Sequence, residues 1–276
     1  MVEVAKLLVV GIDGLRWDRV KDAGAPRLTS LRDRGVFAPS LIPVEYGAET
    51  VSGPGWSTIA TGVWPAKHGV RDNEFEGKRY DQYPEFLTRI ARTGRSTLAV
   101  VDWPPLAEEG VFSAEVGHLI LGDGEAHGYL VEDQRLTKDA VRLLRYGRPD
   151  AAFVYLGSVD MTGHGWGAMS NEYVDMVLAA DGCLGQLLGA IDRRPSREAE
   201  RWLTMVTTDY GHRDGGFNDE ERCTFVLYEG DGVEPGVRDD ARMVDIAATA
   251  LAHLGLEIPA GLDGTSLTSG TPTIVS

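Results

Sequence analysis

The sequence predicts an α/β fold, with a mainly parallel central sheet that carries helices on both faces. Two observations predict it: continuous runs of apolar residues lie between turn residues, and segments with the apolar spacing of amphipathic helices separate these runs. A continuous apolar run, as opposed to an alternating one, is typical of a strand that is buried on both faces. Strands that alternate with such helices are expected to form one layer between two helical layers.

Five runs are predicted to be buried parallel strands, and four segments are predicted to be helices. The strands are expected at residues 6–13, 96–103, 151–160, 202–209 and 223–230. The helices are expected at residues 25–35, 83–94, 137–147 and 171–194, where apolar residues recur every three or four positions. Residues 110–133 are rich in glycine and less regular, so a cap or lid over one sheet edge is expected within residues 74–135.

Size and charge limit the classes of function. A chain of 276 residues suits one α/β domain over residues 1–276. The net charge of −15 argues against a nucleic-acid polymer or an anionic membrane as partner, because both attract clustered lysine and arginine. A small phosphorylated substrate stays compatible if a metal ion supplies local positive charge. The N-terminal apolar run lacks a basic leader, and no run approaches the length of a membrane span, so a cytoplasmic protein is expected.

Three of the predicted strands end on an aspartate, namely Asp13, Asp160 and Asp209. The carboxyl ends of parallel strands meet at the crevice where ligands bind. A single aspartate in such a position is commonly a helix cap or a turn residue. Three of them at one sheet edge would repel one another unless a cation lay between them, which favours a metal site.

A histidine lies near one of these acids. His164 follows Asp160 by four residues in the segment DMTGHGWG, and the two side chains can reach one ion. The alternative is a loop histidine that is hydrogen-bonded to a turn aspartate. Together with the two other strand-end acids, the spacing favours the metal interpretation.

A hydroxyl group precedes a predicted short helix in residues 49–73, ETVSGPGWSTIATGVWPAKHGVRDN. Ser52 would lie at the helix N-terminus, where free backbone N–H groups and the helix dipole favour a phosphoryl group. The place also suits a nucleophile whose pKa is lowered by a metal. The simpler alternative is that Ser52 is a helix cap and Thr50 a turn residue, and the residues alone favour that alternative.

Several motifs together resemble the alkaline phosphatase superfamily, in its type I phosphodiesterase/nucleotide pyrophosphatase branch. The resemblance runs over nearly the whole chain. It is carried by VVGIDGLRWD, SGPGWSTIATGVWPAKHGV, DMTGHGWG, TTDYGHRDGG and the tail MVDIAATALAHLGLEIPAGLDGTSL. It implies an alkaline phosphatase-like fold and a hydrolase that acts on phosphoric ester or phosphoanhydride bonds.

The resemblance also implies roles for individual residues. Ser52, with a proline two residues later, matches the nucleophile, and Thr50 is the alternative. Asn73 matches the asparagine that holds a phosphate oxygen, and the backbone N–H of Gly53 is expected to assist it. His68, in the same segment, is expected to be structural.

Two metal ions are implied by the same resemblance. The ligands of the first are Asp13, Ser52, Asp209 and the residue that follows Asp209. The ligands of the second are Asp160, His164 and a histidine nearer the C-terminus. The resemblance implies zinc for both ions.

The sequence departs from this pattern at two ligands. Tyr210 stands where the family has a histidine, and a tyrosine with its usual pKa of about 10 is a poor ligand. The later histidine is missing as well. His212 is expected to replace one missing ligand, and oxygen for the other is expected from Asp214, Asn218 or Asp219. An oxygen-dominated set favours Mg²⁺, Mn²⁺ or Ca²⁺, with one or two ions bound.

The predicted function is a metal-dependent phosphoester hydrolase of phosphodiesterase or nucleotide pyrophosphatase type, with a serine nucleophile and a nitrogen-poor metal site. Two alternatives stay open: a phosphomonoesterase, or a family member that has lost or redirected hydrolysis and binds an anionic phosphorylated ligand. Four aromatic residues are candidates for contact with a base or leaving group, although core packing explains each of them too. They are Trp56, Trp103, Tyr155 and Trp166.

Overall fold

A central β-sheet organises the computed structural model, which describes residues 3–213 and 219–268. In these residues the sheet has eight strands in the order β4-β3-β5-β1-β6-β7-β2-β8. The strands are β1 (Val4–Ile12), β2 (Val36–Leu41), β3 (Thr97–Val101), β4 (His118–Leu121), β5 (Ala151–Leu156), β6 (Glu200–Thr207), β7 (Cys223–Gly230) and β8 (Gly236–Val237). The predicted α/β class with a mainly parallel sheet is confirmed.

The strand directions differ from the prediction at one place. β1 pairs in parallel with β5 and with β6, and β3 pairs in parallel with β5. β7 is antiparallel to both of its neighbours, β6 and β2, so its prediction as a parallel strand is wrong. A parallel return needs a long crossover, usually through a helix, whereas the described part of the β6–β7 connection holds only the 3₁₀ turn η3 (Asp219–Arg222).

Two of the sheet's strands lie inside the segment predicted to be a cap. Residues 74–135 contain β3 and β4, which form one end of the sheet. The glycine-rich part of this segment holds the edge strand β4, whose four residues are only half-buried or exposed. The apolar run of this edge strand is only three residues, 119–121, which is too short to identify a strand from the sequence. The segment belongs to the sheet layer and its flanking helices, and a separate cap is not found.

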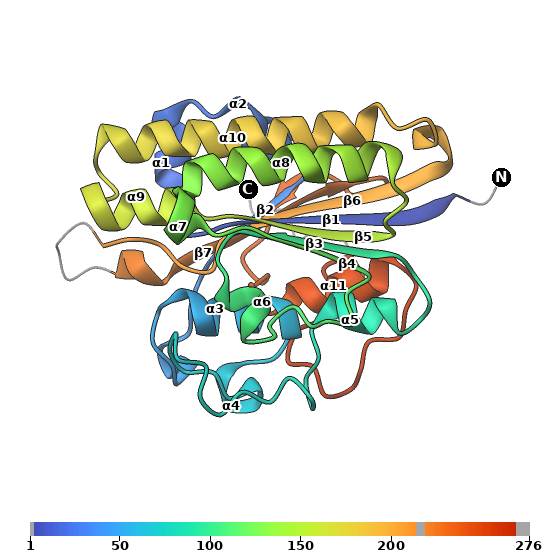
Figure 1. Cartoon of the computed structure of the whole chain (residues 1–276), viewed down its shortest axis with the longest axis horizontal. Helices are drawn as coiled ribbons and strands as arrows, with labels where there is room; N and C mark the ends of the chain where they lie inside the picture. Colours follow the sequence, from blue (N-terminus) through green and yellow to red (C-terminus); the bar gives the residue numbers. More distant parts are fainter. Residues whose placement is uncertain (1–2, 214–218, 269–276) are drawn as a thin grey trace.

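Helices cover both faces of the sheet, as predicted (Figure 1). One face carries α1 (Trp17–Ala23), α2 (Pro26–Arg34), α8 (Tyr129–Tyr146), α9 (Ser158–Trp166) and α10 (Asn171–Asp192). The other face carries α3 (Ser52–Thr61), α4 (Pro65–His68), α5 (Phe86–Ala91), α6 (Pro105–Glu108) and α11 (Asp245–His253). The short α7 (Gly124–His127) leads into α8, and two 3₁₀ turns, η1 (Val44–Tyr46) and η2 (Arg197–Ala199), complete the described elements. All four helices predicted from apolar spacing are present.

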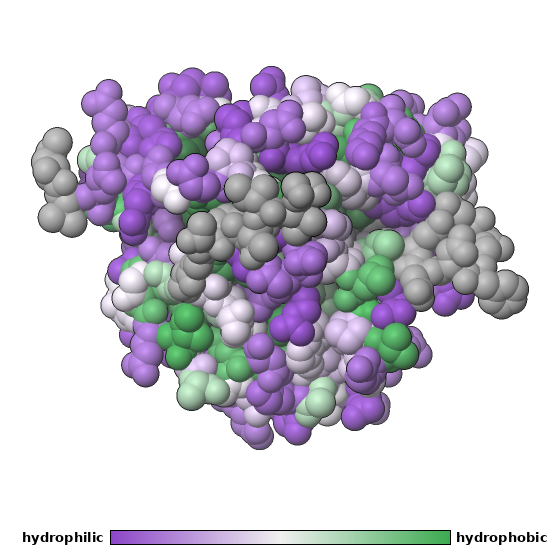
Figure 2. Space-filling model, turned by 180° about the vertical axis from the view of Figure 1, so that it is seen from behind, coloured by the Kyte–Doolittle hydropathy of each residue, from purple (hydrophilic) through white to green (hydrophobic). Residues whose placement is uncertain are grey.

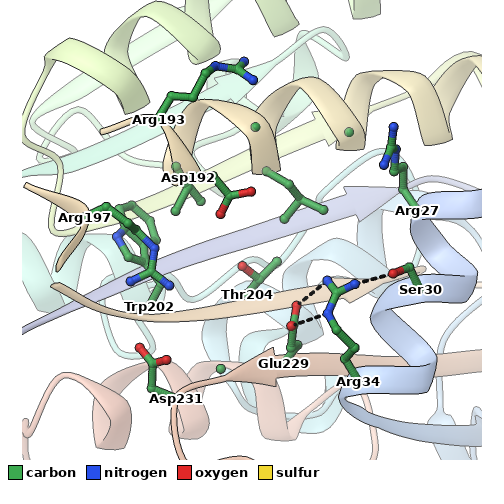
Figure 3. Close-up of a pocket in the computed structure, with 15 residues that line it drawn as sticks. Arg27, Ser30, Arg34, Asp192, Arg193, Arg197, Trp202, Thr204, Glu229 and Asp231 are labelled. Carbon is green, nitrogen blue, oxygen red and sulfur yellow. Dashed lines mark hydrogen bonds and ion pairs between the residues drawn. The ribbon is translucent and has the colours of Figure 1, made fainter. Parts of the chain in front are cut away.

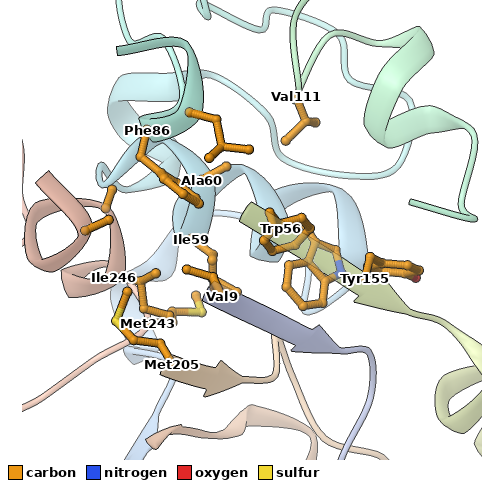
Figure 4. Packing of buried hydrophobic residues seen from close by; sticks show 14 of the residues in the cluster. Val9, Trp56, Ile59, Ala60, Phe86, Val111, Tyr155, Met205, Met243 and Ile246 are labelled. Carbon is orange, nitrogen blue, oxygen red and sulfur yellow. The ribbon is translucent and has the colours of Figure 1, made fainter. Parts of the chain in front are cut away.

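A hydrophobic core lies on each side of the sheet. On the face that carries α3 and α11, Val9 of β1 and Met205 of β6 face Ile59 of α3 and Ile246 of α11 (Figure 4). The indole of Trp56 lies over Gly11 so closely that a Cβ at that position would clash with the ring. Glycine near the end of β1 is therefore required by packing, and it lets α3 lie directly on the strand.

One helix is long and apolar enough to cross a membrane by length and composition alone. This helix is α10, with a mean hydropathy of 1.5. In the structure it packs against α8 and α9. It buries Val177, Leu184 and Leu187 in the hydrophobic core on that face of the sheet. The face of the molecule shown in Figure 2 is mostly hydrophilic, with small separate apolar patches. α10 thus buries one side in the protein, with 44% of its apolar window buried.

His68 is buried among neutral partners, which fits its predicted structural role. It is fully buried, its Nδ1 accepts a hydrogen bond from the backbone N–H of Val70 at 3.1 Å, and its Nε2 lies 3.0 Å from the Thr58 hydroxyl. Burial, and then the charge of Arg79, lowers its pKa to about 3. The folded protein therefore holds His68 in its neutral form.

We expect this histidine to make the protein less stable in acid. Below pH 6.5 the unfolded chain binds a proton that the folded protein excludes down to about pH 3, so the free energy of unfolding decreases as the pH falls. Between pH 7 and pH 5 the loss is about 2 kcal/mol. Urea unfolding at the two pH values measures it. Buried acids such as Asp13, whose pKa burial raises to about 7, contribute in the opposite direction over this range, so the effect of His68 is isolated by comparison with His68→Gln. From pH 7 to pH 5 the wild type should lose about 2 kcal/mol relative to this variant, and an equal pH dependence in both proteins would contradict the assignment.

Candidate active site

Two of the predicted aspartates meet at the carboxyl end of the sheet. Asp13 directly follows β1, and Asp209 lies two residues after the end of β6, the neighbouring strand. Both are fully buried. The backbone N–H of Gly14 donates a hydrogen bond of 3.3 Å to Asp209 Oδ1. The parallel pairing of β1 and β6 therefore brings the two carboxyl groups to one place, as the strand ends predicted.

Asp160 reaches the same place by a different route from the predicted one. β5 ends at Leu156, and Asp160 lies in the first turn of α9, so the prediction that it ends a strand is wrong. Asp160 and His164 stand four residues apart on this helix, which puts them on one face. His164 Nε2 lies 3.4 Å from Asp160 Oδ1. The pair stays together as predicted from its spacing, and a helix holds it.

His212 completes a group of possible metal ligands with this pair. Donor atoms of Asp160, His164 and His212 all lie within 4.8 Å of one another, and His212 Nε2 is 2.9 Å from Asp160 Oδ1. A Cβ at Gly14 or at Gly163 would lie 2.6 or 2.5 Å from this nitrogen. The two glycines therefore form the space that the imidazole fills. The structure places His212 where a third ligand beside Asp160 and His164 was expected.

Tyr210 donates a hydrogen bond to Asp160. Its hydroxyl donates to Asp160 Oδ1 at 2.5 Å and lies 3.4 Å from His164 Nε2. Burial, and then the negative charges of Asp13 and Asp160, raises the pKa of Tyr210 above its usual value. The phenol therefore keeps its proton and orients a carboxylate, in place of binding an ion as a phenolate.

Asp13 is held by two aromatic side chains. Trp56 Nε1 donates to Asp13 Oδ2 at 2.8 Å, and the Tyr155 hydroxyl donates to the same oxygen at 2.5 Å. The other oxygen, Oδ1, lies 3.4 Å from the hydroxyl of Ser52. Trp56 is only 1% exposed, so its predicted contact with a substrate is wrong. Its role is to fix Asp13 with one oxygen turned toward Ser52.

Ser52 is the first residue of α3, as the sequence predicted, and it is buried beside Asp13. The backbone N–H of Gly53 donates to Asn73 Oδ1 at 2.7 Å, so it is not free to hold a phosphate oxygen as predicted. This bond leaves the amide nitrogen of Asn73 as the available donor. A Cβ at Gly53 would lie 2.6 Å from the Asp72 carbonyl, which explains the glycine. Thr50 precedes the helix and is half-buried.

The buried carboxyl groups change one another's protonation. Burial, and then the charge of Asp160, raises the pKa of Asp13 to about 7. Burial, and then the charge of Asp13, raises the pKa of Asp209 well above its usual value. Asp209 Oδ2 is buried without a hydrogen-bond partner, although Asp209 packs tightly against Gly55. A divalent cation fits this set, because it would supply the missing partner and remove the repulsion.

Other predicted residues lie elsewhere or outside the described residues. Nothing is described for Asp214, for Asn218 or for the side chain of Asp219. Among the remaining aromatic candidates, Trp103 and Tyr155 are buried, whereas Trp166 on α9 is 69% exposed. Trp166 is therefore the one of the four that a ligand can reach from solvent.

A fourth aspartate was overlooked in the sequence. Asp102 directly follows β3, in the same relation to its strand as Asp13, and it is fully buried. The sequence did indicate this residue, because the predicted strand at residues 96–103 also leads into an acid. The two aromatic donors to Asp13 carried no such signal, since apolar packing explains both residue types.

A hollow of about 640 Å³ lies away from this site, between α2, α10, β6 and β7. In it the Arg34 guanidinium is bonded to both oxygens of Glu229 and to the hydroxyl of Ser30 (Figure 3). Arginine and acidic side chains both line its walls. It contains none of the predicted site residues, and its charged groups do not converge on one point.

We expect Gly163→Ala to displace His212 from Asp160 and His164, because the added Cβ would lie 2.5 Å from His212 Nε2. Calorimetric titration with Mn²⁺ should show affinity lower by about 10-fold or more. Gly165→Ala on the same helix is the matched control, since a Cβ there meets nothing within 4 Å. The control should be stabilised by about 0.5–1 kcal/mol through helix propensity. Equal affinities of the two variants would contradict the close approach of His212.

Comparisons with known proteins agree on one family. The sequence pattern of the type I phosphodiesterase/nucleotide pyrophosphatase family matches residues 7–107 and 103–224. Ectonucleotide pyrophosphatase/phosphodiesterase family member 7 of Rattus norvegicus is 27% identical over 223 residues, which are 75% of this chain and 49% of that protein. An uncharacterized pyrophosphatase/phosphodiesterase of Schizosaccharomyces pombe is 28% identical over 207 residues, which are 68% of this chain and 41% of that protein. The chain thus spans about half the length of these relatives or less.

Solved structures show the same fold at low sequence identity. Murine ectonucleotide pyrophosphatase/phosphodiesterase 5 superposes with a TM-score of 0.63 at 14% identity, over 92% of this chain and 96% of that one. A phosphonate monoester hydrolase from Silicibacter pomeroyi superposes with a TM-score of 0.71 at 16% identity, over 98% and 78% of the two chains. Since the family pattern covers most of the chain and the fold agrees, the protein belongs to the type I phosphodiesterase/nucleotide pyrophosphatase family.

Proposed function

We propose that this protein is a metal-dependent phosphoester hydrolase of phosphodiesterase or nucleotide pyrophosphatase type, with Ser52 as its nucleophile. The observation that carries the proposal is the convergence of buried carboxyl groups around this hydroxyl. Asp13 Oδ1 lies 3.4 Å from Ser52 Oγ, and Asp209 Oδ2 is buried with no partner. Buried carboxylates in such numbers are tolerable when cations neutralise them. The names of the related proteins supply the reaction class.

Two groups of residues would hold divalent ions. Asp160, His164 and His212 would hold one, where the two imidazoles suit zinc and the carboxylate also suits manganese. Asp13, Asp209 and the Ser52 hydroxyl would hold the other with oxygen alone, which favours Mg²⁺, Mn²⁺ or Ca²⁺. When bound, such ions lower the pKa of a hydroxyl and neutralise charge on the phosphoryl oxygens.

The chain's own residues then have distinct tasks. Ser52 Oγ attacks phosphorus, and the bond from phosphorus to the leaving oxygen breaks on the opposite side as the new bond forms. The hydroxyl proton is lost to solvent, because Asp13 Oδ1, which faces the serine, is the oxygen that would bind the ion. The bonds from Trp56 and Tyr155 to Oδ2 keep Oδ1 turned toward the serine. The amide nitrogen of Asn73 donates to a phosphoryl oxygen while its own oxygen is held by the Gly53 N–H. Water hydrolyses the phosphoserine in a second displacement.

The substrate is proposed to be a small phosphorylated molecule, with Trp166 as a platform for an aromatic group. This side chain is 69% exposed on α9, two residues after His164. A phosphomonoester or a nucleotide diester would both fit this description. The second candidate function, binding of an anionic ligand without hydrolysis, is favoured by Tyr210, which leaves the Asp13–Asp209 group without a nitrogen ligand.

Ser52→Ala should lower kcat for bis-p-nitrophenyl phosphate by about 10³-fold or more, because no other group replaces the nucleophile. Turnover is followed by release of p-nitrophenol with Mn²⁺, Mg²⁺ or Zn²⁺ present. Thr50→Ala is the control and should keep most of the activity. If Thr50→Ala were inactive and Ser52→Ala active, the nucleophile would be assigned wrongly, and if neither change mattered, the proposed function would fail.

Chelation should remove the activity, and a divalent ion should restore it. The oxygen-only group predicts that Mn²⁺ or Mg²⁺ restores turnover at least as well as Zn²⁺. Elemental analysis of the active protein gives the number of ions per chain. Turnover that survives complete removal of metal would contradict the proposed role of the carboxyl cluster.

A further inference from the structure

We propose that Asp102 and Asp133 form a buried carboxyl pair that positions α9, the helix that carries Asp160 and His164. The proposal rests on the proposed function, because α9 matters to catalysis through these two candidate ligands. Neither Asp102 nor Asp133 touches the substrate or the ions in this scheme. Both are positioning residues.

Asp133 caps α9 from another helix. The N-cap residue of α9 is Gly157, which has no side chain to accept hydrogen bonds from the first turn. Asp133 on α8 supplies both bonds: its Oδ1 accepts from the Gly157 N–H at 3.0 Å, and its Oδ2 accepts from the Ser158 N–H at 3.2 Å. The first N–H groups of a helix have no partner within it, and the helix dipole favours a negative charge there. A long-range carboxylate thus replaces the local cap.

The start of α8 is fixed against the same turn. The ring of Tyr129, the first residue of α8, lies so close to Gly157 and to Gly124 that a Cβ at either glycine would clash with it. The backbone N–H of Gly124 in turn donates to the Asp102 carbonyl at 2.8 Å. Gly157 therefore allows the close approach of α8 that brings Asp133 within reach of α9.

Asp102 determines which of the two carboxyl groups is ionised at the N-terminus of α9. It is fully buried, and neither of its carboxyl oxygens accepts a hydrogen bond from any described residue. Burial, and then the neighbouring Asp133, raises the pKa of Asp102 well above its usual value. Two adjacent buried carboxyl groups cannot both ionise, and Asp133 has the two N–H donors that stabilise the ionised form. Burial raises the pKa of Asp133 as well, but hydrogen bonds from Asp102 and from the N–H groups of Gly157 and Ser158 lower it, so Asp102 keeps the proton and donates it to the Asp133 carboxylate.

The cap of α9 lies close to the candidate metal ligands. Asp160 lies in its first turn, two residues after Ser158, so the cap acts next to a ligand. Gly163 of the same helix lies against His212. A shift of the first turn would move Asp160 and Gly163 together relative to His212. Loss of such supporting contacts typically lowers metal affinity by about 10–100-fold.

Four variants of the full chain separate the roles of the pair, with Mn²⁺ affinity by calorimetry as the readout. Asp102→Asn should bind Mn²⁺ within about 3-fold of the wild type, because its amide N–H replaces the acid proton. Asp102→Ala lacks that donor and should bind at least 10-fold more weakly. Asp133→Asn should also bind at least 10-fold more weakly, because one of its two acceptors becomes a donor that faces an N–H group. Asp133→Ala should be weaker still.

Glu85 provides the control for a general loss of stability. It is also a buried carboxyl that caps a helix, with Oε1 accepting from the Thr88 N–H of α5 at 2.8 Å. Glu85→Ala should lower the Tm of the metal-free protein as Asp133→Ala does, and should leave Mn²⁺ affinity unchanged. Tolerance of asparagine at position 133, or equal sensitivity to asparagine at both positions, would overturn the proposal.

Failure of the proposed function is recognised separately. If the wild type binds no divalent ion, the proposed function fails, and amide hydrogen exchange of α9 decides the positioning role. Faster exchange in α9 for Asp133→Asn than for Asp102→Asn would support it. Exchange rates in α9 equal to those of the wild type in both variants would overturn it.

Discussion

Repulsion between buried carboxyl groups is the constraint on which the site depends. Asp13, Asp160 and Asp209 are all buried at the carboxyl end of the sheet. In residues 3–213 and 219–268 no lysine or arginine forms an ion pair with any of them. Neutral donors hold them instead: Trp56 and Tyr155 on Asp13, Tyr210 on Asp160, and the Gly14 N–H on Asp209. Neutral donors fix position and leave the negative charge available to a cation.

The sequence predicts this site where local geometry is enough. A buried parallel strand has one direction and one carboxyl end, so Asp13 and Asp209 could be placed together from two apolar runs. The prediction placed Asp160 wrongly because it carried the strand through Gly157 and Ser158 to Val159, whereas these residues begin α9. The direction of β7 was missed because it depends on the connection and not on the strand's own residues.

What the sequence could not show are contacts between distant segments. The sequence indicates that Trp56 and Tyr155 are core residues, and both are buried in the core. Each also directs the one polar atom of its side chain to Asp13. Tyr210 could be recognised as a poor ligand, but its bond to Asp160 depends on where α9 begins. The cap of α9 spans 24 residues between Asp133 and Gly157, and Gly157 itself gives no sign that its helix needs one.

Replacing a ligand histidine by Tyr210 changes how the site holds its charge. A neutral imidazole would bind an ion and add no charge, whereas the phenol binds a carboxylate and keeps its proton, because burial and nearby acids raise its pKa. The two ligand groups become unequal: both histidines lie with Asp160, and Asp13 and Asp209 have only oxygen. In the proposed mechanism Ser52 is the nucleophile and belongs to the oxygen group, so the ion that would matter most for its attack is the one with the hardest ligands. Under this proposal the same two aspartates would decide both the selection of the metal and the activation of the serine.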